Sequence, residues 1–106
     1  METSLAVAAF AALAQDTRLD IVRLLVRKGA DGAAAGDIGE ELGVNSATLT
    51  FHLKCLTDAR LLTRQRSGRS IIYRADFARL HGLAAFLFEN CCQNLPVASD
   101  TERARA

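Results

Sequence analysis

In the middle of the chain, apolar residues recur at the spacing of a helix, stop at a glycine and then recur again. Ile38 and Leu42 give a first short helix one apolar face, and Gly43 supplies the permissive backbone at which that helix must end. Leu49 and Leu53 begin a second apolar repeat of the same period. The pattern therefore predicts two helices joined by a tight turn.

The opposite face of the second helix is polar and partly basic, which is unusual for a helix that is merely solvated. Either Asn45 or Ser46 can cap its N-terminus. Two helices joined by a short turn containing glycine, the second of them polar, form the arrangement that reads the major groove of DNA. The residues expected on this face are Ser46, Thr48, Thr50, Phe51, His52 and Lys54.

A basic hairpin is predicted directly after the second helix. Residues 61–66 and 71–74 read as strands, and residues 67–70 between them form a turn. An isolated hairpin is marginal in water, so this one is expected to lean on the helices. Three arginines near its tip have no role in a core, namely Arg64, Arg66 and Arg69.

Two more helices are predicted before this region. Residues 4–14 form an alanine-rich helix, which is marginal by itself and needs a partner to lie against. Residues 16–28 form a second helix with Asp16 as N-cap, and residues 30–36 form a loop. The inward faces are expected to carry Leu5, Ala9, Ala12 and Leu13 in the first helix, and Leu19, Val22, Leu25 and Val26 in the second.

A final helix is predicted over residues 76–91. Its apolar stripe runs from Phe77 to Cys91, and Leu83 and Phe86 widen that stripe beyond what a small domain can cover. Because the first and last helices lack enough partners within the chain, we expect them to build a two-fold homodimer. Such a dimer would present two recognition helices about one DNA turn apart.

The predicted fold class is therefore mainly helical with a small β-hairpin wing, a homodimeric winged helix-turn-helix. Residues 1–95 form the DNA-binding and dimerisation domain, and residues 96–106 form a flexible polar tail. With 106 residues the chain suits one domain with a modest core.

The charge distribution supports a polyanionic partner. The net charge is only +1, but residues 46–79 carry seven Lys or Arg and two Asp or Glu, so that this segment is strongly basic. A local basic block in a nearly neutral chain is the footprint expected for nucleic acid, with an ordinary solvated face as the alternative.

Composition also excludes several functional classes. No apolar run approaches the roughly 20 residues that span a bilayer, and the alanine-rich N-terminus lacks the basic region of a signal peptide. We therefore expect a cytoplasmic protein with reduced cysteines and no membrane partner. With two histidines, no glycine-rich phosphate loop and no acid–base constellation, the chain is not expected to be an enzyme or to bind an organic cofactor.

The segments DTRLDIVRLL and LGVNSATLTFHLKCLTDARLLTRQRSGRSIIYR closely resemble the ArsR/SmtB family of bacterial repressors, over roughly residues 10–92. The resemblance implies a winged-helix dimer that stays on double-stranded operator DNA until a metal or metalloid ion loosens it. It also implies that the polar face of the second helix lies against DNA, with the three wing arginines on the backbone or minor groove.

Phe51 departs from the commoner form of the family, which has Arg or Gln at this position. An aromatic ring can contact a thymine methyl but cannot make a bidentate contact to guanine. The operator is therefore expected to differ from the family's best-known ones.

Two of the family's sensor sites are missing from this sequence. At the start of the helix-turn-helix, where some members carry thiols, this chain has Ala34, Gly36 and Gly39. The zinc-type site on the last helix needs an Asp-x-His followed by a distant His-x-x-Glu, and Asp76 and His81 do not have that spacing.

The remaining candidate is the adjacent pair Cys91 and Cys92, which resembles the ENCC ending of some arsenic-responsive members. Two neighbouring thiolates suit a soft ion such as trivalent arsenic, either arsenite or methylarsenite. Arsenite prefers three thiolates, and Cys55 is the only other cysteine. The structural alternatives are that Cys91 is a small hydrophobic residue at an interface and that Cys55 is a packing residue.

Two other functions stay open at this point. The same fold could serve as a thiol-redox or persulfide sensor, although adjacent cysteines make strained disulfides. It could also serve as a winged helix used only for contacts between proteins.

Overall fold

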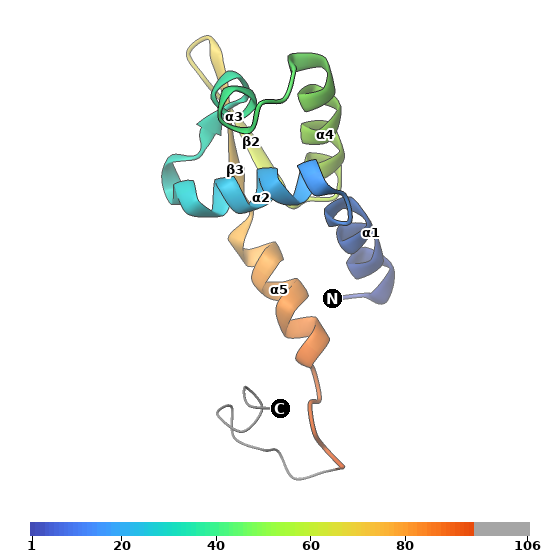
Figure 1. The fold of residues 1–106 in the computed structure, drawn as a ribbon. Helices are drawn as coiled ribbons and strands as arrows, with labels where there is room; N and C mark the ends of the chain where they lie inside the picture. The colour runs from blue at the N-terminus through green and yellow to red at the C-terminus, as the bar shows by residue number, and fades with distance from the viewer. Residues whose placement is uncertain (95–106) are drawn as a thin grey trace, which may run out of the picture.

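The computed structural model describes residues 1–94, so the predicted tail of residues 96–106 lies outside the described part of the chain. It shows a mainly helical winged helix-turn-helix with a three-stranded antiparallel wing, which confirms the predicted fold class (Figure 1). The elements are α1 (Thr3–Leu13), α2 (Asp16–Lys28), the 3-10 turn η1 (Gly29–Asp31), β1 (Ala33–Ala34), α3 (Ala35–Leu42), α4 (Ser46–Asp58), β2 (Leu62–Ser67), β3 (Ser70–Ala75) and α5 (Phe77–Phe88).

The sheet contains a strand that the sequence pattern did not predict. The order is β1-β3-β2, and Ala33 pairs with Tyr73 in the expected loop of residues 30–36. Gly32 turns the chain into this strand with a φ of 63°, and a Cβ there would clash with the carbonyl oxygen of Tyr73. Two alanines are too short a run to show a strand period, and only their partner β3 makes them a strand.

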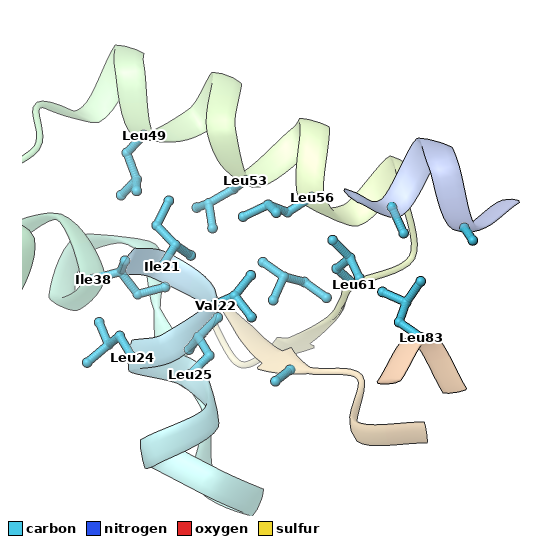
Figure 2. Packing of buried hydrophobic residues seen from close by; sticks show 14 residues of the cluster. Ile21, Val22, Leu24, Leu25, Ile38, Leu49, Leu53, Leu56, Leu61 and Leu83 are labelled. Atoms are coloured by element: carbon cyan, nitrogen blue, oxygen red, sulfur yellow. The ribbon is translucent and has the colours of Figure 1, made fainter. Parts of the chain in front are cut away.

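The core lies where α2, α3 and α4 meet the base of the wing (Figure 2). Leu53 of α4 and Ile38 of α3 are buried against α2, as their spacing predicted. In α2, however, Ile21 and Leu24 are buried while Leu19 and Val26 are exposed, which corrects the predicted inward face. The predicted helical period is right, but the buried face of α2 is rotated about the helix axis relative to the predicted face.

Helices α1 and α5 project from this body on the same side of the molecule (Figure 1). Ala6 and Ala9 bury one face of α1, whereas Leu5, expected to point inward, is 47% exposed. Leu83 anchors α5 in the core. The outer faces of both helices are therefore apolar and uncovered within one protomer.

Helix α5 ends earlier than predicted. It stops at Phe88, because Glu89 adopts extended backbone angles and Asn90 has a φ of 61°. Cys91 therefore lies beyond the helix, and the prediction that it continues the apolar stripe is wrong. None of the helices within residues 1–94 is long and apolar enough to cross a membrane.

Candidate nucleic-acid interface and thiol pair

The turn between α3 and α4 sets the angle at which the second helix leaves the body. Gly43 ends α3 with a left-handed φ of 67°, and the backbone N–H of Val44 donates to the carbonyl of Gly39 at 2.9 Å. A Cβ at Gly39 would lie 2.9 Å from the Val44 oxygen and 3.2 Å from Leu49 Cδ2, so only glycine permits this close approach.

Asn45 is the N-cap of α4, one of the two caps that we predicted. Its side-chain oxygen accepts a hydrogen bond from the backbone N–H of Thr48 at 2.9 Å. This bond satisfies one of the unpaired donors at the helix start and fixes where the helix begins. The first turn of α4 is consequently presented to solvent in a defined orientation.

Five of the six side chains predicted to face DNA are exposed on α4. Phe51 is the one large apolar residue among them, and it is 61% exposed. The hydroxyl of Thr50 donates to the Ser46 carbonyl at 2.8 Å, so its hydrogen is already used within the helix. The exposed residues are Ser46, Thr48, Thr50, Phe51 and Lys54.

His52 does not belong to this exposed face, which corrects its predicted position. It is 7% exposed, and its Nδ1 lies 3.3 Å from a guanidinium nitrogen of Arg18 in α2. The helical period brings His52 next to the buried Leu49 and Leu53 stripe, so it points toward α2. Its ring still touches the exposed face, because it contacts the Phe51 ring edge-on at a centroid distance of 5.5 Å.

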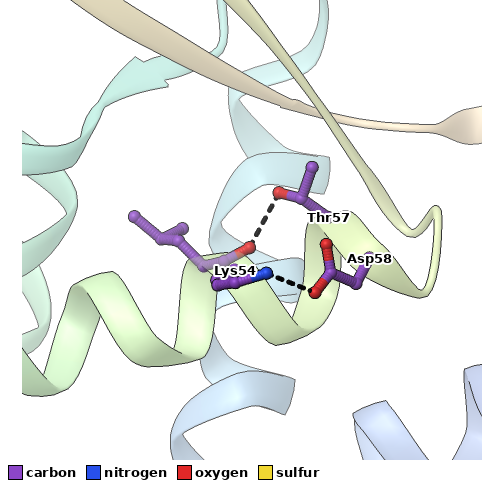
Figure 3. A network of polar contacts seen from close by, with 4 residues as sticks. Lys54, Thr57 and Asp58 are labelled. Carbon is purple, nitrogen blue, oxygen red and sulfur yellow. Dashed lines mark hydrogen bonds and ion pairs between the residues drawn. The ribbon is translucent and has the colours of Figure 1, made fainter.

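Lys54 pairs with Asp58 one turn further along α4 (Figure 3). The two charged atoms are 2.9 Å apart, and both side chains are well exposed. The hydrogen bond to Asp58 and the charge of that carboxylate raise the pKa of Lys54 above its usual 10.5. Such an exposed i,i+4 pair is weak, so Lys54 can exchange Asp58 for another anion.

The wing brings a further cation to the same surface. Arg64 of β2 stands opposite Tyr73 of β3, and these two side chains line a hollow of about 220 Å³ against α4. Four residues of α4 complete the lining of that hollow, namely Thr50, Lys54, Thr57 and Asp58. Segments far apart in sequence thus combine the helix and the wing into one basic surface.

The other two wing arginines lie further out. Arg66 is two residues beyond Arg64 on β2, so both lie on the same face of the strand. The Nε of Arg66 donates to the carbonyl of Gly68 at 3.3 Å. Gly68, with a φ of 62°, occupies the first central position of the two-residue turn, where a type II′ hairpin takes glycine. Arg69 follows it and is exposed at the tip.

Sequence reasoning missed two members of this surface, Asp58 and Tyr73. Asp58 could have been found from its position four residues after Lys54, the spacing of a helical ion pair. Tyr73 could not, because its place beside Arg64 depends on the strand register.

The thiol pair lies just beyond α5. Cys91 is exposed and Cys92 is partly exposed, and the backbone N–H of Cys91 donates to the Phe88 carbonyl at 2.9 Å. Cys92 has a φ of 64°, a left-handed conformation that is uncommon for a residue with a Cβ. Within residues 1–94 of one protomer, no three His, Cys, Asp or Glu side chains group to hold a metal. Among these residues Cys55 on α4 does not join the pair in a group of three ligands, and its role as a third ligand stays a prediction.

Comparison with known proteins agrees with this architecture. A family model described as a helix-turn-helix domain matches residues 13–65. The arsenical resistance operon repressor of Bacillus subtilis (strain 168) is 34% identical over 83 residues, which cover 78% of this chain and 75% of that protein. The chain belongs to the ArsR family. It is a DNA-binding transcriptional repressor of that family, and not an enzyme.

Solved structures of ArsR-type proteins superpose on the chain. An ArsR-like transcriptional regulator from Rhodococcus sp. RHA1 has a TM-score of 0.71 at 31% identity, covering 79% of this chain and 76% of that one. A homodimeric winged helix-turn-helix DNA-binding domain from Mycobacterium bovis has a TM-score of 0.65 at 25% identity, covering 91% and 89%. The AntR antimony-specific transcriptional repressor has a TM-score of 0.61 at 34% identity, covering 76% and 72%.

Proposed function

We propose that this ArsR-family protein is a metalloid-responsive repressor, which binds operator DNA as a homodimer and is released by trivalent arsenic at Cys91 and Cys92. The observation that carries the proposal is the position of two adjacent thiols directly after the exposed outer face of α5. The similarity to an arsenical resistance operon repressor and to an antimony-specific repressor supports a trivalent metalloid as the signal.

The DNA surface consists of the exposed face of α4 together with the wing. Lys54 and Arg64 meet at one hollow, so that they can contact one stretch of phosphate backbone. Arg66 and Arg69 extend this positive surface to the tip of the wing, within reach of the backbone or the minor groove. His52 lies beneath this surface and supports it without contacting DNA, because it is buried against α2.

The dimer is formed by α1 and α5. Leu87 and Phe88 are 64% and 65% exposed at the end of α5, and Leu5 and Val7 are exposed on α1. A helix that is apolar on every side needs protein on every side, and α1 is apolar or small almost throughout. A two-fold axis through these helices would cover both faces at once.

The thiol pair suits a soft trivalent centre. Two thiolates satisfy methylarsenite, in which one substituent is already carbon, whereas arsenite needs a third sulfur. Since one protomer offers no group of three ligands among its described residues, the third thiolate would come from the partner protomer or from a small thiol.

A continuous path of backbone hydrogen bonds connects α5 with the recognition helix. The N–H of Asp76, the N-cap of α5, donates to the Leu61 carbonyl at 2.9 Å. The N–H of Leu61 in turn donates to the Leu56 carbonyl near the end of α4 at 3.0 Å. A metalloid that repositions the end of α5 can therefore change the spacing of the two α4 helices, provided that it binds the DNA-incompetent form more tightly.

The test is operator binding measured by fluorescence anisotropy, with DNA from upstream of the chain's own gene and fully reduced protein. Arsenite, methylarsenite, zinc and polysulfide are titrated separately into the complex. We expect release by a trivalent arsenical, and the loss of that release in the Cys91→Ser/Cys92→Ser protein. Cys55→Ser is the matched control and should still be released, because Cys55 does not group with the pair.

Other outcomes would contradict the proposal in different ways. If arsenic still releases the Cys91→Ser/Cys92→Ser protein from operator DNA, the cysteine pair is not the sensor. Release by polysulfide alone would favour a thiol-redox or persulfide sensor of the same fold. Duplex binding without any preference for sequence would favour a module for protein contacts.

A further inference from the structure

The exposed face of α4 carries almost no group that can read a base by paired hydrogen bonds. Bidentate contacts in the major groove come from Arg or Lys on guanine and from Asn or Gln on adenine. Within α4 there is no Arg, Asn or Gln, and Lys54 is the only Lys. Hydroxyl groups such as those of Ser46 and Thr48 can contact several bases and discriminate poorly.

Three of the polar side chains on this surface already have partners within the protein. The side-chain oxygen of Asn45 accepts from Thr48 N–H, and adenine would need both the oxygen and the nitrogen of that amide. The Thr50 hydroxyl donates to the Ser46 carbonyl, and Lys54 pairs with Asp58 beside the wing. Base reading through Asn45 would first break the cap of α4, and the Thr50 hydroxyl has no hydrogen left to donate.

Apolar groups, in contrast, gather on the first two turns of α4. Ala47, Thr48 and Phe51 are all exposed. Phe51 follows Thr48 by three residues and Ala47 by four, so it lies on the same side of the helix as both. The Phe51 ring is held edge-on against His52, and Arg18 anchors His52 from behind. This patch is therefore presented in a defined orientation, at the end of a recognition helix that contacts base edges.

The apolar group that B-DNA displays in its major groove is the C5-methyl of thymine. We propose that α4 recognises its operator half-site through thymine methyl groups, and that Phe51 is the residue that determines this specificity. The inference rests on the proposed placement of α4 in the major groove. It assigns sequence reading to van der Waals contact and leaves the arginines of the wing to hold the backbone.

The test replaces each thymine of the bound operator in turn by deoxyuridine, which lacks only the C5-methyl. At one or more thymines in each half-site we expect binding to weaken about fourfold per methyl, as the transfer of one buried methyl predicts. Phe51→Ala should weaken binding to the natural operator and no longer distinguish thymine from deoxyuridine at those positions. Phe51→Leu should retain part of the discrimination, because it keeps an apolar side chain.

Arg66→Ala is the matched control. Loss of the arginine side chain should weaken binding to the thymine operator and to the deoxyuridine operator by the same factor, since a phosphate contact does not depend on the methyl group. Because Phe51 is exposed, Phe51→Ala should melt at the same temperature as the natural chain, which separates recognition from folding.

Two results would overturn the inference while the repressor function stands. One is an operator in which no thymine is sensitive to loss of its methyl, and the other is a Phe51→Ala protein that is as sensitive as the natural chain. If the natural chain prefers no duplex over competitor DNA, the proposed function fails and the inference fails with it.

Discussion

The guanidinium of Arg18 lies 3.3 Å from Nδ1 of His52, and this contact joins α2 to the inner face of the recognition helix. The same guanidinium donates through Nε to the carbonyl of Ala12 in α1 at 2.7 Å. One side chain thus connects the proposed dimerisation helix, α2 and α4. A guanidinium can only donate, so Arg18 is the donor of this contact to the His52 ring.

Arg18→Ala should destabilise the protein by about 1–3 kcal/mol, because it leaves two partly buried acceptors without their donor. It should also weaken operator binding, since α4 loses its support from α2. Urea denaturation measures the first effect and anisotropy the second. Arg23→Ala, an exposed position on the same helix, is the control and should change neither. Equal stability of the Arg18→Ala and Arg23→Ala proteins would refute the structural role of the contact.

Gly39→Ala should destabilise the fold by about 1–3 kcal/mol, because its Cβ would press on the Val44 carbonyl and on Leu49. Gly36→Ala in the same helix α3 is the matched control, since a Cβ there meets no atom within 4 Å. It should stabilise the protein by about 0.4–1 kcal/mol through a less flexible unfolded chain. Thermal unfolding followed by circular dichroism measures both, and a stabilising Gly39→Ala would contradict the close approach of α3 and α4.

Asp58→Asn should strengthen operator binding about two- to fivefold at low salt, because it removes a negative charge beside Lys54 and the proposed phosphate path. The gain should shrink as salt is added. Nuclear magnetic resonance of the lysine side chains should show the pKa of Lys54 falling toward 10.5, since Asp58 raises it. Glu41→Gln, which removes the exposed partner of Lys28 away from this surface, is the control. Equal gains from both substitutions would point to net charge rather than to this site.

Leu87→Glu should convert the dimer to monomer. A two-fold interface contains this position from both protomers, so two new negative charges would enter one apolar interface. Sedimentation equilibrium measures the mass, and operator binding should weaken with it. Leu87 is 64% exposed in one protomer, so the substitution should leave the monomer fold intact. Phe51→Glu, a similarly exposed apolar position on α4, should remain dimeric. Should Leu87→Glu stay dimeric, the interface must lie elsewhere.

Several features could be predicted from short stretches of sequence, because local physical chemistry determines them. Helix α2 runs from Asp16 to Lys28 as predicted, and Asn45, one of the two predicted caps, caps α4. The N-cap of α2 was predicted wrongly, because the side chain of Gln15 and not that of Asp16 accepts the hydrogen bond from the Arg18 N–H. The hairpin turn was likewise predicted, at the glycine that now shows a φ of 62°. Caps, periods and turn residues act within one or two turns of chain, so the sequence alone contains them.

Tertiary structure decided which side of each element meets the body. Leu19 and Val26 are exposed and His52 is buried, against the prediction, because a period does not say where the partner helix lies. The short strand β1 exists only through its pairing with β3, and the left-handed residue Asn90 ends α5 before the thiols.

The sequence by itself determined the helices, the β2–β3 hairpin of the wing, the basic segment and the family of this protein. Only the tertiary structure brought Arg64 and Tyr73 beside α4, and showed that no three ligands meet within residues 1–94 of one protomer. The reason is physical: periods and caps depend on neighbours in the chain, whereas a binding surface depends on contacts between distant segments, which strand register and core packing decide.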